Sequence, residues 1–199
     1  MTPTPLLAAA LLLASALPAT ADTSLTAYDA ARQAMLAIWA ELPLTVRNVA
    51  LTDGPPAGYG DYTPHKGNSF TPGETIEVYA ELLGYGFKDD GAGNFGAAVD
   101  ADLALVDAAG TTVARKDRFV SIAKSSREKI LETDLAFTVT LSAFAPGSYT
   151  LHVSVHDEVS GKQTAFDVPV TLLAGAGSAS QPAPDAASDL SAPASDASQ

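Results

Sequence analysis

The chain has 199 residues, a formal net charge of −12 and no cysteine. Without cysteine there can be no disulfide, no thiol nucleophile and no thiolate metal site. The acidic charge argues against a nucleic-acid partner, which needs a basic surface, and disfavours adsorption to anionic membranes. Because there are no disulfides, stability must come from packing alone.

The first 21 residues have the pattern of a secretion signal. An apolar run from Leu6 to Leu17 is shorter than the roughly 20 residues needed to span a bilayer. It is followed by Ala19-Thr20-Ala21, the small-x-small pattern that signal peptidase accepts. We expect cleavage after Ala21 and a periplasmic or secreted protein with no stable membrane insertion. A membrane anchor is the alternative, because the segment carries no Lys or Arg.

Residues 22–43 are predicted to contain one amphipathic helix, from Ser24 to Leu42. Apolar residues recur at steps of three and four and form one stripe of Tyr28, Ala31, Met35, Ile38 and Leu42. Thr26 followed by Asp29 resembles a capping box, and Pro43 ends the helix. Trp39 lies beside the stripe and is expected to anchor the helix on the following domain. The alternative is a helix that docks to a partner.

From residue 44 to residue 173 the apolar period changes to two, which indicates β-strands. Turn signals such as Asp107–Gly110 and Glu158–Gly161 separate short alternating segments. The expected strands are Thr45–Leu51, Thr75–Leu83, Phe95–Val106, Thr111–Phe119, Leu135–Leu141, Tyr149–Val155 and Lys162–Leu173. Seven alternating strands predict an all-β domain built as an antiparallel sandwich.

Three motifs sharpen this prediction. Pro146-Gly-Ser-Tyr149 resembles a tyrosine corner, in which the hydroxyl bonds to upstream backbone. Together with Phe70-Thr-Pro-Gly-Glu74 and the segment from His156 to Lys162, it makes residues 44–173 resemble bacterial exported immunoglobulin-like and fibronectin type III-like domains. The resemblance implies a seven-stranded immunoglobulin-like sandwich and little about function. An antibody-type domain is not expected, because its cysteine pair and strand-C tryptophan are absent.

Residues 174–199 form a segment rich in Ala, Ser, Pro and Asp, with Leu190 as its single large apolar residue. Such a segment cannot bury enough apolar surface to offset the entropy of ordering, so we expect disorder. It would act as a solubilising tail or spacer, or alternatively as a tether to a partner.

The sequence offers little catalytic chemistry. It contains no HExxH, GxSxG or Walker motif. Of its three histidines, His152 and His156 lie four residues apart on one expected strand, about 13 Å, too far to share a metal ion. His65 lies in a loop. We expect no catalytic residue and no cofactor.

Acidic side chains have simple explanations. Asp89, Asp90 and Asn94 come nearest to a cation-binding loop, but the EF-hand spacing is missing, so we expect a polar hairpin and no metal. Two further carboxylate pairs are expected on solvent-exposed strand faces, where they aid solubility: Glu77 with Glu81, and Asp100 with Asp102.

Two groups of residues are candidates for contact with a ligand or partner. The first contains aromatic residues of glycine-rich loops and their neighbours: Tyr59, Tyr62, Tyr85, Phe87, Lys88 and His156. In an immunoglobulin-like sandwich, the loop from Tyr85 to Asn94 shares one end with the turn from Asp157 to Gly161. That end would form a contact surface. Alternatively, the rings plug the ends of the core.

The second group is a basic patch within fifteen positions: Arg115, Lys116, Arg118, Lys124, Arg127 and Lys129. One explanation is an edge strand protected by charge against unwanted strand pairing. The functional explanation is docking to an acidic partner or an anionic polysaccharide.

The favoured hypothesis is a non-enzymatic exported binding module that contacts a protein or glycan of the cell envelope through loops of the sandwich. The alternative is a structural accessory subunit of an envelope assembly, docked through the helix around Trp39 or through a sheet edge. A metal-assisted hydrolase that uses His65, His156 and the Asp89-Asp90 loop is the least favoured hypothesis.

Overall fold

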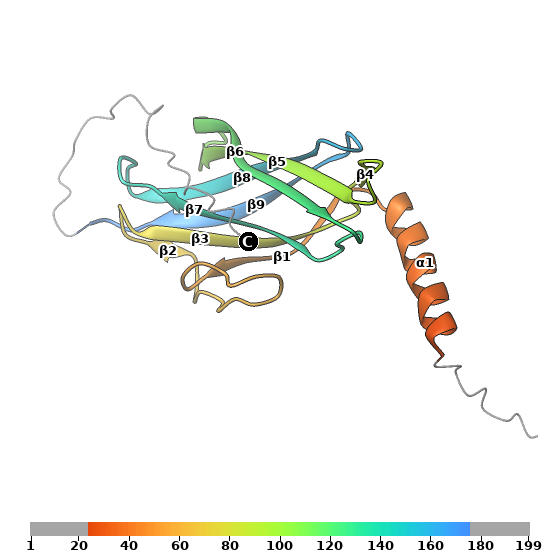
Figure 1. Cartoon of the computed structure of the whole chain (residues 1–199). Helices are drawn as coiled ribbons and strands as arrows, with labels where there is room; N and C mark the ends of the chain where they lie inside the picture. The colour runs from red at the N-terminus through yellow and green to blue at the C-terminus, as the bar shows by residue number, and fades with distance from the viewer. Residues whose placement is uncertain (1–23, 176–199) are drawn as a thin grey trace, which may run out of the picture. The chain divides into compact units, whose positions relative to one another are not determined.

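The computed structural model describes residues 24–175, and this part of the chain contains one helix and nine strands in two sheets (Figure 1). The chain divides into two compact units after Met35. The predicted signal peptide and the predicted tail beyond residue 175 lie outside the described residues. In the described part, no helix has the length and apolar character needed to cross a membrane.

Helix α1 covers Leu25–Glu41, close to the predicted range. Its first turn is capped by Ser24, whose Oγ accepts a hydrogen bond from the Ala27 N–H at 3.2 Å, and not by the expected box at Thr26. Trp39 is the buried residue of the helix. Ile38, on the predicted apolar stripe, is 65% exposed. Trp39 therefore makes the anchoring contact expected of it, whereas Ile38 of the stripe is exposed to solvent.

The C-terminal end of α1 is held by Lys162. Its Nζ donates hydrogen bonds to the carbonyl oxygens of Ala40 at 3.2 Å, Leu42 at 2.6 Å and Gly84 at 2.9 Å. A cation at this end satisfies carbonyls that have no partner within the helix and complements the helix dipole. One lysine thus joins the helix end to the turn after β3.

The smaller sheet is antiparallel and has the order β1-β3-β7. Its strands are β1 (Thr45–Thr52), β3 (Thr75–Leu83) and β7 (Thr133–Thr140). The register of β1 shifts between Arg47 and Ala50, and Asn48 has a φ of 52° within this bulge.

The larger sheet has the order β2-β9-β8-β5-β4, and β6 pairs with β5. Its strands are β2 (Ser69–Phe70), β4 (Lys88–Asp89), β5 (Phe95–Asp107), β6 (Thr112–Ser126), β8 (Gly147–Asp157) and β9 (Gln163–Leu172). All pairs are antiparallel except β2 with β9. Each of the seven predicted strands is present. The two further strands, β2 and β4, have two residues each, too few for a recognisable alternation.

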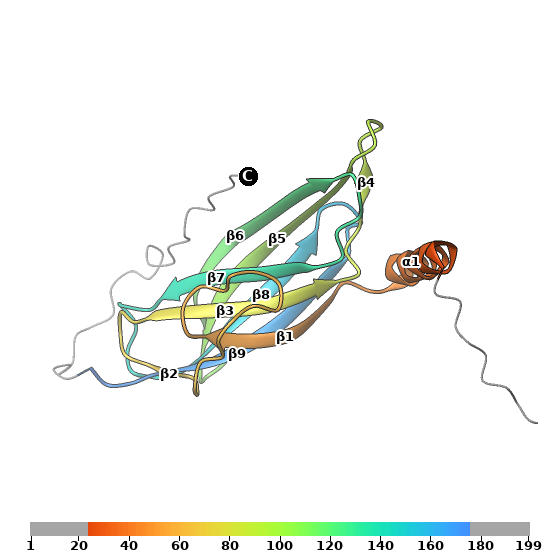
Figure 2. The same cartoon turned by 60° about the horizontal axis from the view of Figure 1, so that its bottom comes forward.

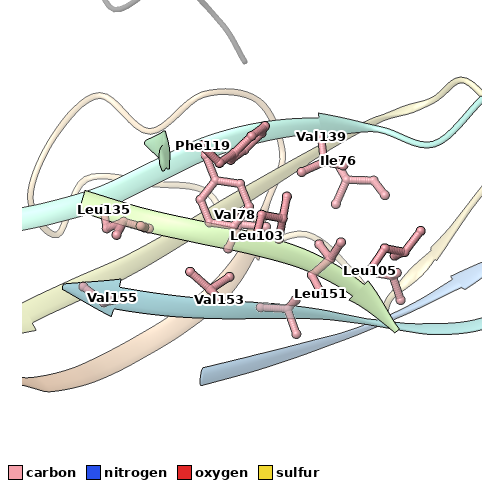
Figure 3. Packing of buried hydrophobic residues seen from close by; sticks show 14 of the residues in the cluster. Ile76, Val78, Leu103, Leu105, Phe119, Leu135, Val139, Leu151, Val153 and Val155 are labelled. Carbon is pink, nitrogen blue, oxygen red and sulfur yellow. The ribbon is translucent and has the colours of Figure 1, made fainter. Parts of the chain in front are cut away.

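The core lies between the two sheets (Figure 3). Ile76, Val78 and Val139 of the smaller sheet meet Leu103 and Leu151 of the larger one, and each is at most 1% exposed. These residues occupy alternate positions of their strands, as the period of two predicts. The coarse prediction of a mostly β protein with one preceding helix is therefore confirmed.

Two predicted local structures are present. The Tyr149 hydroxyl donates to the Ala145 carbonyl at 2.8 Å, which is the bond expected of a tyrosine corner. At the turn between β5 and β6, Gly110 has a φ of 79° and the Asp107 carboxylate accepts the N–H groups of Ala109 and Thr111. Both motifs bond through local backbone, which explains why sequence reveals them.

The loop of residues 53–68 lies over the outer face of the smaller sheet (Figure 2). Tyr62 stacks on Tyr79 with ring centroids 4.2 Å apart, and the Gly60 N–H donates to the Tyr79 hydroxyl at 2.7 Å. Glu77 and Glu81, on the same face of β3 as Tyr79, are 7% and 4% exposed. The expectation that these two carboxylates face solvent is wrong, because the alternation pattern does not reveal that a loop covers this face.

Candidate functional site

The two loops that were expected to share one end of the β unit do meet. The Gly86 N–H donates to Asp157 Oδ2 at 2.6 Å, and a Cβ at Gly86 would lie 3.0 Å from the Cβ of Ser160. The turn after β8 is itself closed by the Gly161 N–H bonding to the Asp157 carbonyl. This contact brings Phe87 and the start of β4 beside the turn. Not all of the residues predicted to contact a ligand at this end lie on its surface, however.

Tyr85 is a core residue. It is 2% exposed, and its hydroxyl bonds to the Ile130 carbonyl and to Thr133 Oγ1. Burial raises the pKa of this phenol above its ordinary value. The ring leaves no exposed surface for a partner. Its role is to fix the β6–β7 loop, and with it the neighbouring Lys129.

A row of aromatic rings leads from Trp39 toward Lys129. Trp39 meets Tyr85 edge-on at 5.1 Å between centroids, and Tyr85 meets Phe87 at 5.3 Å. The Lys129 Nζ then lies 5.7 Å from the centroid of Phe87 and 5.3 Å from that of Phe95. Both distances are within the range of cation–π attraction. Phe87, Phe95 and Lys129 are each half-buried, so this end of the row reaches the surface.

Strand register adds Lys124 to this end. Lys124 pairs with Ala97, two residues after Phe95, and cross-strand partners share a face of the sheet. Lys88 pairs with Gly96 and therefore lies on the opposite face. We call Phe87, Phe95, Lys124 and Lys129 the cationic–aromatic surface. Arg127, exposed in the loop between β6 and β7, flanks it in the chain.

The predicted basic patch is divided by the fold into paired and unpaired charges. Arg115 bonds to Asp102 at 3.1 Å and to Asp117 at 2.7 Å, and Arg118 Nε bonds to Asp100 at 2.7 Å. The ammonium of Lys116 lies over the Phe119 ring at 5.5 Å. In residues 24–175, no ion pair is recorded for Lys124, Arg127 or Lys129. Only the second half of the patch therefore has free positive charge.

The paired arginines belong to a charged cluster on the outer face of the larger sheet. Asp100 is 7% exposed and the Asp102 side chain is 16% exposed, so the expectation that both point freely into water is wrong. Arg118 sits in a bulge of β6 with a φ of 49°, and its N–H donates to Asp102 Oδ1 at 2.8 Å. The bulge directs its guanidinium back over Asp100.

His156 joins this outer cluster and not the loop end. Its Nε2 lies 3.3 Å from Asp102 Oδ2, a distance that admits an ion pair when the ring is protonated. The direction does not suit a hydrogen bond, and this buried atom has no hydrogen-bond partner among the described residues. His156 and Phe87 therefore do not form the single contact surface that the sequence suggested.

Tyr59 and Tyr62 serve the loop that covers the smaller sheet. The Arg47 NH2 group donates to the Tyr59 hydroxyl at 2.8 Å, while Arg47 Nε donates to Glu81 at 2.7 Å. Burial alone would raise the pKa of Glu81, but hydrogen bonds from Asn48, Arg47 and the tyrosines outweigh it and lower that pKa. Burial raises the pKa of Tyr79 to about 12. Tyr59 and Tyr62, whose rings are both half-buried, thus hold the loop against the sheet.

The Asp89–Asn94 hairpin is closed by its own hydrogen bonds. The Asp90 carboxylate accepts the N–H groups of Ala92 and Asn94 and the Asn94 side-chain amide, which lowers its pKa. His65, the other member of the hydrolase hypothesis, pairs instead with Asp53 at 2.5 Å. No group of three His, Asp or Glu residues within the described part of the chain is arranged to hold a metal ion.

A further trio, missed by motif analysis, lies on the outer face of β8 and β9. His152 Nδ1 is 2.6 Å from Asp167 Oδ1, and His152 Nε2 is 3.5 Å from Ser154 Oγ. The sequence signal for this trio is a His-x-Ser pattern on one strand with an Asp opposite the His on the next strand, because His152 pairs with Asp167 in the sheet. The order of atoms matches a catalytic triad, but the side chains of His152 and Asp167 are 41% and 63% exposed, and neighbouring backbone N–H groups belong to the sheet ladder. The Asp167 carboxylate is thus open to solvent, whereas the acid of a catalytic triad is buried.

A pocket of about 250 Å³ lies between β1 and β9. Its lining is mainly apolar and consists of Val49, Ala50, Leu51, Asn68, Asp167, Val168 and Pro169. None of the residues singled out from the sequence as contact candidates lines it.

Comparison with known proteins gives no match, either to a family model or to a curated protein sequence.

Proposed function

We propose that this protein is a non-enzymatic exported binding module that contacts a protein or glycan of the cell envelope through the cationic–aromatic surface. The observation that carries the proposal is the position of Lys129, whose ammonium lies over both Phe87 and Phe95. It joins the aromatic and the basic candidate groups in one place. Large rings at a surface are typical of recognition sites, and unpaired charge attracts a ligand of opposite charge.

Other features support this proposal. The chain has a formal net charge of −12. Unpaired lysines gathered at one end of the β-sheets therefore create a local positive potential on an otherwise acidic protein. The tyrosine corner and the two packed sheets support an immunoglobulin-like domain, an architecture on which many binding proteins are built. The signal-like segment of residues 1–21 supports a periplasmic or secreted location.

The test is affinity capture with the mature protein, residues 22–199, from its own cell envelope after cross-linking in place. A Lys124→Gln/Lys129→Gln variant is expected to lose the captured species. The matched control is Lys66→Gln/Lys88→Gln, which removes the same charge from exposed positions outside the surface. Equal capture by both double variants contradicts the assignment of the site.

The non-enzymatic role has its own test at the His152–Ser154–Asp167 trio. We expect wild type and Ser154→Ala to hydrolyse p-nitrophenyl acetate at the same rate, because no oxyanion stabiliser accompanies this serine. We also expect no labelling of Ser154 by a fluorophosphonate probe. A rate that falls in Ser154→Ala, together with labelling of wild type, contradicts a purely binding role.

A further inference from the structure

The charges of the cationic–aromatic surface indicate the chemical class of its ligand, an inference that rests on the proposed function. Arg115 and Arg118 are neutralised by neighbouring carboxylates, whereas Lys124, Arg127 and Lys129 have no recorded ion pair in residues 24–175. An anionic ligand is therefore attracted to the second group and not to the first.

The kind of cation matters. Arginine presents a planar fork that can bind one carboxylate or phosphate bidentately, but here both arginines of the outer cluster already bond to carboxylates: Arg118 to Asp100, and Arg115 to Asp102 and Asp117. Lysine is a compact charge without a fixed direction. Lys124 and Lys129 therefore favour a ligand with repeated, spaced negative charges over one that needs a single directed bond. The third arginine of the basic patch, Arg127, is exposed in the loop between Lys124 and Lys129 in the chain.

Flat apolar area lies directly beside these charges. Phe87 and Phe95 are half-buried, and the side chain of Lys129 extends over both rings. The stem of a lysine adds further apolar surface beneath its charge. A sugar acid presents an apolar ring face next to a carboxylate, which matches this combination. An acidic peptide presents its carboxylates on flexible stems with no flat apolar unit beside them.

The position of the surface suits a long ligand. Its residues come from the segment after β3, the start of β5, the end of β6 and the β6–β7 loop. The β4–β5 hairpin, which includes Phe95, projects from the end of the larger sheet (Figure 2). A polymer that lies along these segments can meet several cations at once. Small molecules instead bind in enclosed pockets.

We propose that the cationic–aromatic surface binds an acidic polysaccharide, a chain of sugar units that carry carboxylates. The probes are polygalacturonate, neutral dextran and poly-L-glutamate, each titrated against the mature protein at low salt. We expect binding of polygalacturonate, none of dextran, and at least tenfold weaker binding of poly-L-glutamate. Affinity for polygalacturonate falls as NaCl is added, because salt screens exposed charges.

Variants locate the site. Lys124→Gln, Arg127→Gln and Lys129→Gln are each expected to weaken polygalacturonate binding about two- to fivefold. Lys66→Gln and Lys88→Gln are the controls that leave it unchanged. Phe95→Leu keeps an apolar side chain of smaller volume but removes the flat ring, and is expected to weaken polygalacturonate binding without affecting the binding of poly-L-glutamate. Unchanged thermal unfolding shows that each variant is folded.

Each contrary outcome has a distinct meaning. Equal binding of polygalacturonate and poly-L-glutamate overturns the polysaccharide class, since charge alone would then explain the affinity. Loss of binding in the control variants overturns the site. If the protein binds none of the three polymers but still captures an envelope component that depends on Lys124 and Lys129, the ligand class is wrong and the binding module stands.

Discussion

The indole N–H of Trp39 donates a hydrogen bond to the backbone carbonyl of Tyr85 at 2.9 Å. The indole is 7% exposed and meets the Tyr85 ring edge-on. Trp39 is thus used within its own unit, where it ties the end of α1 to the segment that carries Phe87. A residue buried in this way has no free face with which to dock the protein into an assembly.

Replacement of Trp39 tests this anchoring role. Trp39→Ala is expected to lower the free energy of unfolding by about 3–5 kcal/mol, the usual cost of removing a large buried ring. Trp39→Phe keeps most of the packing and loses the hydrogen bond, so its cost is about 1–3 kcal/mol. Urea unfolding of both variants gives these values. A Trp39→Ala variant as stable as wild type would show that the anchor is dispensable and would restore Trp39 as a docking residue.

Gly84 lies where the end of α1 approaches the turn after β3. Its φ is 76°, and a Cβ at this position would lie 2.3 Å from the carbonyl oxygen of Pro43. Gly110 has a φ of 79° but no atom within 4 Å of its Cβ position. The two glycines therefore separate the cost of an unusual φ from the cost of a steric clash.

We expect Gly110→Ala to be destabilised by about 1–2 kcal/mol, the cost of a left-handed conformation with a side chain. Gly84→Ala should lose about 1–3 kcal/mol more, because the backbone must move to admit the methyl group. Thermal or urea unfolding of the pair measures the difference. Equal losses would mean that the Pro43–Gly84 contact opens without cost.

Strand positions could be read from the sequence because the core is built from alternation. Val78, Leu103 and Val153 are buried at the places that a period of two assigns to them. The tyrosine corner and the Asp107–Gly110 turn were also readable, since each bonds to nearby backbone. What alternation does not encode is the cover on an outer face. Glu81 alternates like an exposed residue but is buried, because the loop of residues 53–68, distant from it in the chain, covers this face of the sheet.

The candidate site was only partly readable for a related reason. Phe87 and Lys129 were both singled out, but their contact depends on how the Tyr85 hydroxyl holds the β6–β7 loop at Ile130. Charge counting along the chain also treated Arg118 and Lys129 alike. Ion pairing between strands distinguishes them, because Asp100 and Arg118 come together only when β5 and β6 pair.

The phenol of Tyr79 predicts a stability change at high pH. Burial raises its pKa to about 12 from an ordinary value of 10.0, so the folded state favours the neutral form. This contribution is complete below pH 10, where the phenol is neutral in both states. It is lost as the pH rises from 10 to 12, because the unfolded chain releases the proton first.

Tyr79→Phe cannot titrate and is the natural comparison. At neutral pH it should be less stable than wild type, because it loses the bond from the Gly60 N–H and leaves that donor without its partner. The difference in unfolding free energy between the two proteins should shrink as the pH rises from 10 to 12. A difference that stays constant over this range would show that Tyr79 does not titrate as its burial requires.

Arg118 combines a strained backbone with an ion pair, and two substitutions separate them. Arg118→Ala and Arg118→Gly both remove the guanidinium from Asp100, a carboxylate of which 11% of the side chain remains exposed. Alanine keeps the unfavourable φ of 49°, whereas glycine adopts it freely. We therefore expect both variants to be less stable than wild type, with Arg118→Gly about 1 kcal/mol more stable than Arg118→Ala.

The two variants are compared by urea unfolding at pH 7. The slope of the unfolding free energy against urea concentration must be the same for both. Each loses the same charge, and each keeps the N–H that donates to Asp102. If the glycine variant is instead the less stable of the two, the bulge has relaxed to an ordinary strand conformation in Arg118→Ala. The left-handed turn would then be a consequence of the Arg118–Asp100 pair, since removal of the guanidinium alone would release it.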